Sequence, residues 1–307
     1  MTAASEKSQA TKSNKRSFPI GLAYIFPWII GFSVFQLYPL CMSLYYSFTN
    51  YNITQKPRFI GLSNYLNIFT RDDLFWQSLG VTLKYVLIAV PGKLMVALFI
   101  AMLLNARIKC INFFRTMYYL PSILGGSVVI SLLWRFLFLR DGLINQLFKT
   151  MGLPWVDWLG DPSIALFTIS FQTIWQFGSS MVLFLAGLKQ IPSELYESAN
   201  VDGASKLRIF IKITLPLLSP IIFFNLVMQT INAFQEFTTA FVITKGGPVR
   251  ATYLYGMKLY NDAFVFFKMG YASALSWILF AIIIVFTVMI FKTSDYWTYY
   301  DDGGRVN

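Results

Sequence analysis

Hydrophobic and polar positions in this chain alternate on a coarse scale: six long apolar runs are separated by polar segments. Each run is long enough to cross the hydrocarbon core of a bilayer, which takes about 20 helical residues. The runs cover residues 19–47, 79–104, 114–139, 163–189, 215–243 and 270–292. The pattern therefore predicts an all-α integral membrane protein with six transmembrane helices.

Composition supports this prediction. Hydrophobic residues make up 56% of the chain and charged residues only 13%, whereas soluble domains carry about 25% charged residues. The net charge of +11 would indicate nucleic-acid binding in a soluble protein. Here the cations cluster at the flanks of the apolar runs, so membrane topology explains them and no nucleic-acid partner is expected.

The distribution of lysine and arginine orients the chain. The N-terminus, two of the loops and the tail together hold thirteen of these residues, against nine on the other side. Because cytoplasmic flanks are enriched in lysine and arginine, both termini are predicted to face the cytoplasm. The predicted organisation is a disordered cytoplasmic N-terminus, a six-helix membrane domain and a cytoplasmic tail, at residues 1–17, 18–292 and 293–307.

Several kinds of chemistry are excluded by what the sequence lacks. It has no histidine, which rules out HExxH zinc sites and Ser-His-Asp triads. It also has no GxxxxGK[ST] phosphate-binding loop, because Gly92-Lys93 is followed by Leu94. We therefore expect no enzyme activity, no metal and no cofactor on this chain.

The most charged interruption between two apolar runs lies at residues 190–216. Acidic residues precede Gly203, and cations alternate with apolar residues after it. Glycine alone adopts left-handed backbone angles without steric cost, so Gly203 suits a sharp reversal. Pro216 suits the first turn of the next helix, where its missing N–H does little harm. The segment is predicted to form helix, turn and helix at the membrane surface.

This segment also carries a family resemblance. Its pattern is Glu-x-Ala, three residues, Gly, nine residues and Ile-x-Leu-Pro. The matching residues are Glu197, Ala199, Gly203, Ile213, Leu215 and Pro216. The pattern resembles the EAA loop in permease subunits of binding-protein-dependent ABC importers; Ser198 replaces the usual second alanine. The resemblance implies a type I importer permease fold in a bacterial inner membrane, with 190–216 as a cytoplasmic coupling loop.

The resemblance further implies partners for this chain. In the family, the EAA loop transmits ATP-driven closure of the ATPases to the membrane helices. The residues expected to take part in this coupling are Glu197, Ala199, Asp202, Gly203, Ala204 and Leu207. The expected partners are a second homologous permease, two ATPases that hold ATP and magnesium, an extracytoplasmic sugar-binding protein and the surrounding lipid. Segments such as Tyr119-Leu120-Pro121 and Gly246-Gly247-Pro248 resemble the carbohydrate branch of the family.

The fifth apolar run carries a polar stripe. Asn225, Gln229, Asn232 and Glu236 stand at i, i+4, i+7 and i+11 and would share one face of a helix. Amides and carboxylates suit sugar hydroxyls, and in membrane helices they usually face a cavity. In the maltose-importing members of the family, polar residues at this depth contact the sugar, although Ala233 departs from their pattern. The alternative is a stripe that joins two helices.

Four further cavity candidates come from the third and fourth runs. They are Trp134, Gln172, Trp175 and Gln176. Tryptophan rings stack on sugars, but a packing role is an equal alternative. The predicted function is therefore ATP-driven import of a carbohydrate, in particular an oligosaccharide. Import of glycerol phosphate or a related polyol is the alternative within the family, and Glu236 favours a neutral sugar over it. An ion-coupled secondary transporter is the alternative from another class.

Overall fold

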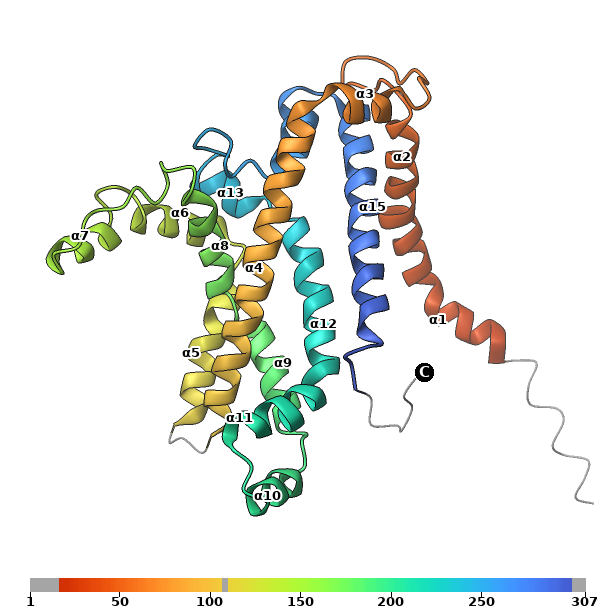
Figure 1. Ribbon diagram of the computed structural model, residues 1–307. Coiled ribbons are helices and arrows are strands. Elements are labelled where there is room, and N and C mark those ends of the chain that lie inside the picture. Colours follow the sequence, from red (N-terminus) through yellow and green to blue (C-terminus); the bar gives the residue numbers. More distant parts are fainter. Residues whose placement is uncertain (1–16, 107–109, 300–307) are drawn as a thin grey trace, which may run out of the picture.

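The computed structural model describes residues 17–106 and 110–299, with side chains from Tyr24 onwards. Nearly all of the predicted disordered N-terminus and the last residues of the predicted tail lie outside these ranges. All regular structure in the described ranges is helical, apart from isolated bridges between Thr49 and Phe59 and between Asn52 and Gln55. The all-α prediction is confirmed. The long helices run roughly side by side (Figure 1).

The first span consists of two helices in series. Helix α1 (Ser17–Phe32) leads through a π-helical turn at Ser33–Leu37 into α2 (Tyr38–Ser47). Pro39 lies in the first turn of α2, where it cannot donate a hydrogen bond into the preceding turn. Helix α2 packs along α15, whereas α1 diverges from the rest of the bundle (Figure 1).

Helix α4 (Asp73–Asn105) is the central helix of the bundle. It packs against α8, α9, α12 and α14. Small residues on its buried side, among them Ala89, Ala97 and Ala101, are fully buried and let neighbouring helices approach closely. Asp72 caps its first turn by accepting a hydrogen bond from the Phe75 N–H at 3.0 Å.

The third and fourth predicted spans, 114–139 and 163–189, are each divided into two helices. Helices α5 (Ile111–Leu124) and α6 (Val128–Leu137) meet at an angle of 103°. Gly126, with φ of +79°, turns the chain between them. The fourth run is divided into α8 (Ala165–Trp175) and α9 (Gly178–Leu188). Apolar composition alone marked each of these runs as continuous.

The fifth span begins earlier and ends earlier than predicted. Helix α11 (Lys206–Ile209), a π-helical turn at Phe210–Thr214 and α12 (Leu215–Phe234) form one continuous helix of 29 residues. The chain then breaks, and α13 (Thr238–Ile243) is separate. The second half of the predicted coupling loop is therefore the first part of the fifth span. The sixth span, α15 (Met269–Ser294), is a single helix.

Short helices connect the spans at both ends of the bundle. Helix α10 (Ser193–Val201) protrudes at one end, and α3 (Ser63–Arg71) lies at the other (Figure 1). The remaining connections contain α7 (Leu143–Thr150), α14 (Tyr255–Tyr260) and a π-helical turn at Asn261–Val265.

A buried charge cluster joins the starts of α4 and α15 to α14 and the π-helical turn that follows it, at the end of the bundle that carries α3. The Lys258 ammonium on α14 lies 2.6 Å from the Asp72 carboxylate and 3.0 Å from that of Asp262. The Tyr271 hydroxyl at the start of α15 donates to Asp72. Burial raises the pKa of Asp72, but the hydrogen bonds from Lys258 and Tyr271 outweigh it and hold that pKa below its usual value. The cluster therefore depends on charged carboxylates.

Candidate functional site

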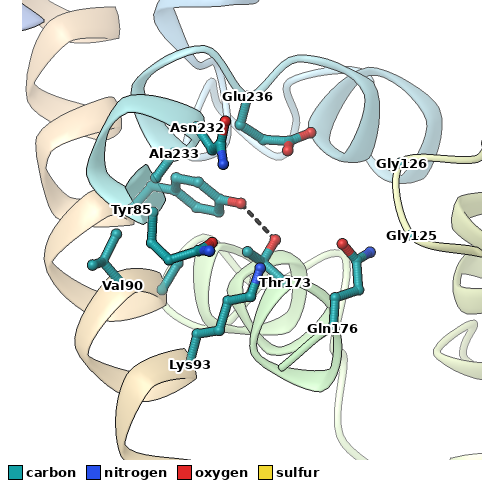
Figure 2. Close-up of a pocket in the computed structure, with 12 residues that line it drawn as sticks. Tyr85, Val90, Lys93, Gly125, Gly126, Thr173, Gln176, Asn232, Ala233 and Glu236 are labelled. Carbon is teal, nitrogen blue, oxygen red and sulfur yellow. Dashed lines mark hydrogen bonds between the residues drawn. The ribbon is translucent and has the colours of Figure 1, made fainter. Parts of the chain in front are cut away.

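A polar cavity of about 370 Å³ lies in the interior of the bundle. Pockets that bind small molecules have volumes of about 300–1,000 Å³. The cavity is bordered by α4, α8, α12 and the break between α5 and α6 (Figure 2). Its lining residues are Tyr85, Ala89, Val90, Lys93, Gly125, Gly126, Thr173, Gln176, Gln229, Asn232, Ala233 and Glu236.

Three helix breaks meet at this cavity. They are Gly125-Gly126 between α5 and α6, Gln176 between α8 and α9, and Glu236 between α12 and α13. The Ser122 hydroxyl bridges two of them, because it donates to the Gln176 carbonyl at 3.1 Å and accepts from the Ser179 N–H at 2.9 Å. Irregular backbone at membrane depth is tolerated where it is buried in protein or lines a polar cavity. The breaks thus bring polar side chains to one place.

The cavity carries amides, hydroxyls and one charge of each sign. The Tyr85 hydroxyl and Thr173 Oγ1 lie 2.6 Å apart, which joins α4 to α8 (Figure 2). Glu236 accepts a hydrogen bond from the Thr239 N–H at 2.8 Å and so caps α13. Among the described residues, no group of three His, Cys, Asp or Glu side chains could hold a metal ion. These side chains suit reversible binding of a polar molecule.

Four of the eight predicted substrate residues line this cavity. They are Gln176, Gln229, Asn232 and Glu236. Glu236, however, does not extend the helical stripe, because α12 ends at Phe234. It reaches the cavity from the irregular backbone that follows. Whether these residues contact a substrate stays a prediction.

The other four predicted residues lie outside the cavity lining. Asn225 is buried and donates to the Ile221 carbonyl at 3.0 Å within its own helix. Gln172 is also buried and donates to Ser131 Oγ at 3.1 Å, which joins α8 to α6. The rings of Trp134 and Trp175 pack 5.6 Å apart on those same two helices. In this structure the four contribute to helix packing.

Sequence reasoning did not assign three of the polar lining residues to a cavity. Lys93 stood out as a charge inside an apolar run, but nothing in the sequence connected it with the fifth run. Tyr85 and Thr173 resemble ordinary residues of a membrane helix. Only the packing of α4 against α8 and α12 brings the three together.

The predicted turn at Gly203 is present and well defined. Gly203 has φ of +70°, and its N–H donates to the Asn200 carbonyl at 3.1 Å. The Ala204 N–H donates to the Ala199 carbonyl at 2.9 Å. This pair of hydrogen bonds is a Schellman motif, which ends α10 and reverses the chain. Ser205 then caps α11 by accepting from the Arg208 N–H at 3.4 Å.

The segment from α10 to α11 is exposed at the protruding end of the bundle (Figure 1). Glu197 and Asp202 are exposed, and Ala199 and Ala204 are half-buried. Two apolar side chains are also exposed, Val201 by 88% and Leu207 by 67%. Exposed apolar side chains with both signs of charge around them are typical of a protein contact surface.

One contact that the sequence did not reveal joins α10 to the fifth span. The Tyr196 hydroxyl and Thr214 Oγ1 lie 3.1 Å apart. Thr214 is buried directly before α12 begins. This contact therefore links α10 to the base of the helix that carries Gln229 and Asn232.

A comparison with known proteins identifies the family of this chain. The model of the family described as "Binding-protein-dependent transport system inner membrane component" matches residues 93–294, more than half of the chain. The chain belongs to this family. The resemblance inferred from the 190–216 segment is thus confirmed over most of the membrane domain.

Individual relatives agree with this assignment. A probable ABC transporter permease, YesP of Bacillus subtilis, is 49% identical over 95% of both chains. The multiple sugar-binding transport system permease MsmF of Streptococcus mutans is 35% identical, covering 85% of this chain and 90% of its own. The sulfoquinovosyl glycerol transport system permease SmoG of Agrobacterium fabrum is 34% identical, with 88% and 89% covered.

A solved structure has the same fold. A bacterial ABC transporter involved in import of the acidic polysaccharide alginate aligns with a TM-score of 0.77 at 23% identity. The alignment covers 93% of this chain and 98% of that one. The chain therefore has the type I permease fold and is a permease component of a binding-protein-dependent ABC transport system. Its relatives are transport subunits rather than enzymes.

Proposed function

We propose that this permease imports an oligosaccharide by ATP-driven alternating access, with the polar cavity as part of its sugar-binding site. The observation that carries the proposal is this cavity of about 370 Å³ in a member of the binding-protein-dependent permease family. Its amides and hydroxyls can both donate to and accept from sugar hydroxyls. Relatives named for multiple sugars and for sulfoquinovosyl glycerol support a carbohydrate substrate.

The proposed assembly contains a second permease, two ATPase subunits that bind ATP and magnesium, and an extracytoplasmic binding protein. Both termini and the 190–216 loop would face the cytoplasm. ATP binding would draw the ATPases together, displace α10, and open the bundle toward the binding protein. The permease itself would supply the path and perform no covalent chemistry.

The continuous helix Lys206–Phe234 explains how the loop could act on the cavity. An α-helix rises about 1.5 Å per residue, so Asn232 lies about 39 Å from Lys206 along this helix. The π-helical turn at Phe210–Thr214 alters the helical geometry but does not interrupt the helix, so a tilt imposed at α11 would be passed on toward the cavity wall. The hydrogen bond between Tyr196 and Thr214 connects α10 to the same helix.

Purification from native membranes tests the proposed assembly. In mild detergent, the tagged permease is expected to bring down an ATPase and a second permease. The ATPase activity of the purified complex should rise when a sugar-loaded binding protein is added. A lone permease that transports sugar without these subunits would overturn the proposal.

A substitution at Glu236 tests the sugar site. Glu236→Gln keeps an acceptor for the Thr239 N–H but removes the negative charge. A hydrogen bond to a charged acceptor is stronger than one to a neutral acceptor by about 1 kcal/mol. Uptake at subsaturating sugar is therefore expected to fall about fivefold. The control is Asp295→Asn, which removes an exposed carboxylate at the end of α15. Equal uptake by Glu236→Gln and wild type would assign Glu236 to capping alone.

A double-mutant cycle tests the contact between α10 and the fifth span. Tyr196→Phe and Thr214→Val each remove one partner of a hydrogen bond that contributes about 0.5–1.5 kcal/mol. Each is expected to lower ATPase stimulation by the loaded binding protein about two- to tenfold. The double variant should be no worse than either single variant, because both remove the same contact. Additive losses would show that the two residues act independently.

A further inference from the structure

Lys93 is the feature of the cavity that import of a neutral sugar leaves unexplained. It lies on α4, its side chain is 9% exposed, and it lines the cavity. Among the described residues, ion pairs join Lys258 to Asp72 and Asp262, and Lys93 is in none of them. Nor does any described residue form a hydrogen bond with its ammonium group.

The Lys93 ammonium group cannot reach the membrane surface from its position within α4. Twelve residues separate it from Asn105 and twenty from Asp73, the two ends of the helix. At about 1.5 Å per residue these distances are about 18 Å and 30 Å, far longer than a lysine side chain. A charge held at this depth normally faces a partner or a polar cavity and is functional.

Glu236 interacts with Lys93 electrostatically across the cavity, but the two side chains form no ion pair. Lys93 and Glu236 enter the cavity from different sides (Figure 2). One Glu236 oxygen already accepts from the Thr239 N–H at 2.8 Å. The cavity therefore has a cationic part at Lys93 and an acceptor-rich part at Glu236. The amides of Gln176 and Asn232 also line it.

We propose that Lys93 binds a carboxylate of the transported sugar, so that the substrate is an oligosaccharide that contains uronic acid. Its carboxylate would accept from the Lys93 ammonium, while ring hydroxyls would donate to Glu236 and pair with the amides. A phosphate ester carries a charge of about −1.5 to −2, which a single lysine opposite a carboxylate neutralises poorly. A uronate carries a single negative charge, which matches one lysine.

This assignment rests on the proposed function, and uptake by cells that carry the whole importer tests both. The probes are di- to tetrasaccharides that carry a single galacturonate, glucuronate or mannuronate residue, their methyl esters, the corresponding neutral oligosaccharides, and glycerol 3-phosphate. The ester keeps the linkage, removes the charge and adds one methyl group. The variants are Lys93→Met, the charge-preserving Lys93→Arg, and Lys84→Met. Lys84 lies on the same helix but is exposed outside this cavity.

The wild-type permease is expected to take up at least one of the free, singly charged uronate-containing oligosaccharides faster than its neutral counterpart. Lys93→Met should lower that uptake at least tenfold and change uptake of the methyl ester less than twofold. Lys93→Arg should restore part of the activity, and Lys84→Met should match the wild type. All variants are compared at equal amounts in the membrane.

Distinct results would overturn the two proposals. If neutral oligosaccharides enter and no uronate does, the substrate class proposed for Lys93 is wrong but the importer stands. An equal loss of acid and ester in Lys93→Met would mean that Lys93 only positions α4. Uptake of glycerol 3-phosphate in preference to the uronates would show that Lys93 binds a phosphate and not a carboxylate. If no sugar enters through the wild-type importer, the proposed function itself fails.

Discussion

Gly203→Val is expected to lower sugar uptake tenfold or more while the permease stays in the membrane. Gly203 has φ of +70°, and a side chain in this left-handed region costs about 1–2 kcal/mol. A Cβ at Gly203 would meet no atom within 4 Å, so only the backbone angle is disturbed. The Schellman turn sets the angle between α10 and the helix that begins at Lys206. A change in this angle misplaces both the exposed segment from α10 to α11 and that helix.

Two further variants test whether the backbone angle at Gly203 causes the loss of uptake. Gly203→Asn should keep most of the uptake, because asparagine tolerates left-handed angles. Gly61→Val imposes similar strain elsewhere, since Gly61 has φ of +57° and equal space around it. It lies in the loop before α3, at the other end of the bundle, and should leave the coupling intact. Wild-type uptake by Gly203→Val, or an equal loss in Gly61→Val, would contradict the coupling role.

Lys258→Met is expected to destabilise the permease more than any other single change discussed. Removing one partner of a buried ion pair typically costs about 3–5 kcal/mol, because the remaining charge stays buried and uncompensated. Here two carboxylates, Asp72 and Asp262, would be left facing each other. Thermal unfolding in detergent should therefore begin at a clearly lower temperature. Lys268→Met serves as the control, since Lys268 is exposed beside Phe266.

The same cluster predicts how stability depends on pH. The pKa of Asp72 in the folded permease lies below its usual value, despite the burial that raises it. A carboxylate of this kind contributes stability above its unfolded pKa of about 3.9. That contribution is lost as the pH falls through the lower, folded value. Wild type should therefore lose more stability than Lys258→Met when the pH drops below about 4. Parallel pH profiles would contradict the assignment.

Sequence reasoning predicted those features that a local pattern determines. Apolar runs indicated where membrane segments lie, because burial in lipid demands a long unbroken stretch of such residues. Gly203 was predicted to turn the chain because its backbone requirement is local. The helix break at Gln235 carries neither glycine nor proline, and Gly178, which follows the break at Gln176, did not by itself distinguish a break from a continuous helix. Both breaks depend on the packing of α8 and α12 against α4.

The polar stripe of the fifth run shows where periodicity stops being informative. It identified Gln229 and Asn232 correctly as lining residues, since helical spacing places them on one face. Asn225 shares that spacing, yet its amide is satisfied by the Ile221 carbonyl of its own helix. Lys93 comes from another helix altogether. A single helix reveals which of its faces is polar but not which residues lie opposite.

The most direct test of the proposed function is uptake by proteoliposomes that contain the complete purified importer, with binding protein and labelled oligosaccharide outside and ATP with magnesium inside. Accumulation of sugar is expected only when both ATP and the binding protein are present, and it should be insensitive to ionophores. Gly203→Val should reduce it to background with the complex intact. Accumulation that follows an ion gradient without ATP would contradict the account and indicate a secondary transporter.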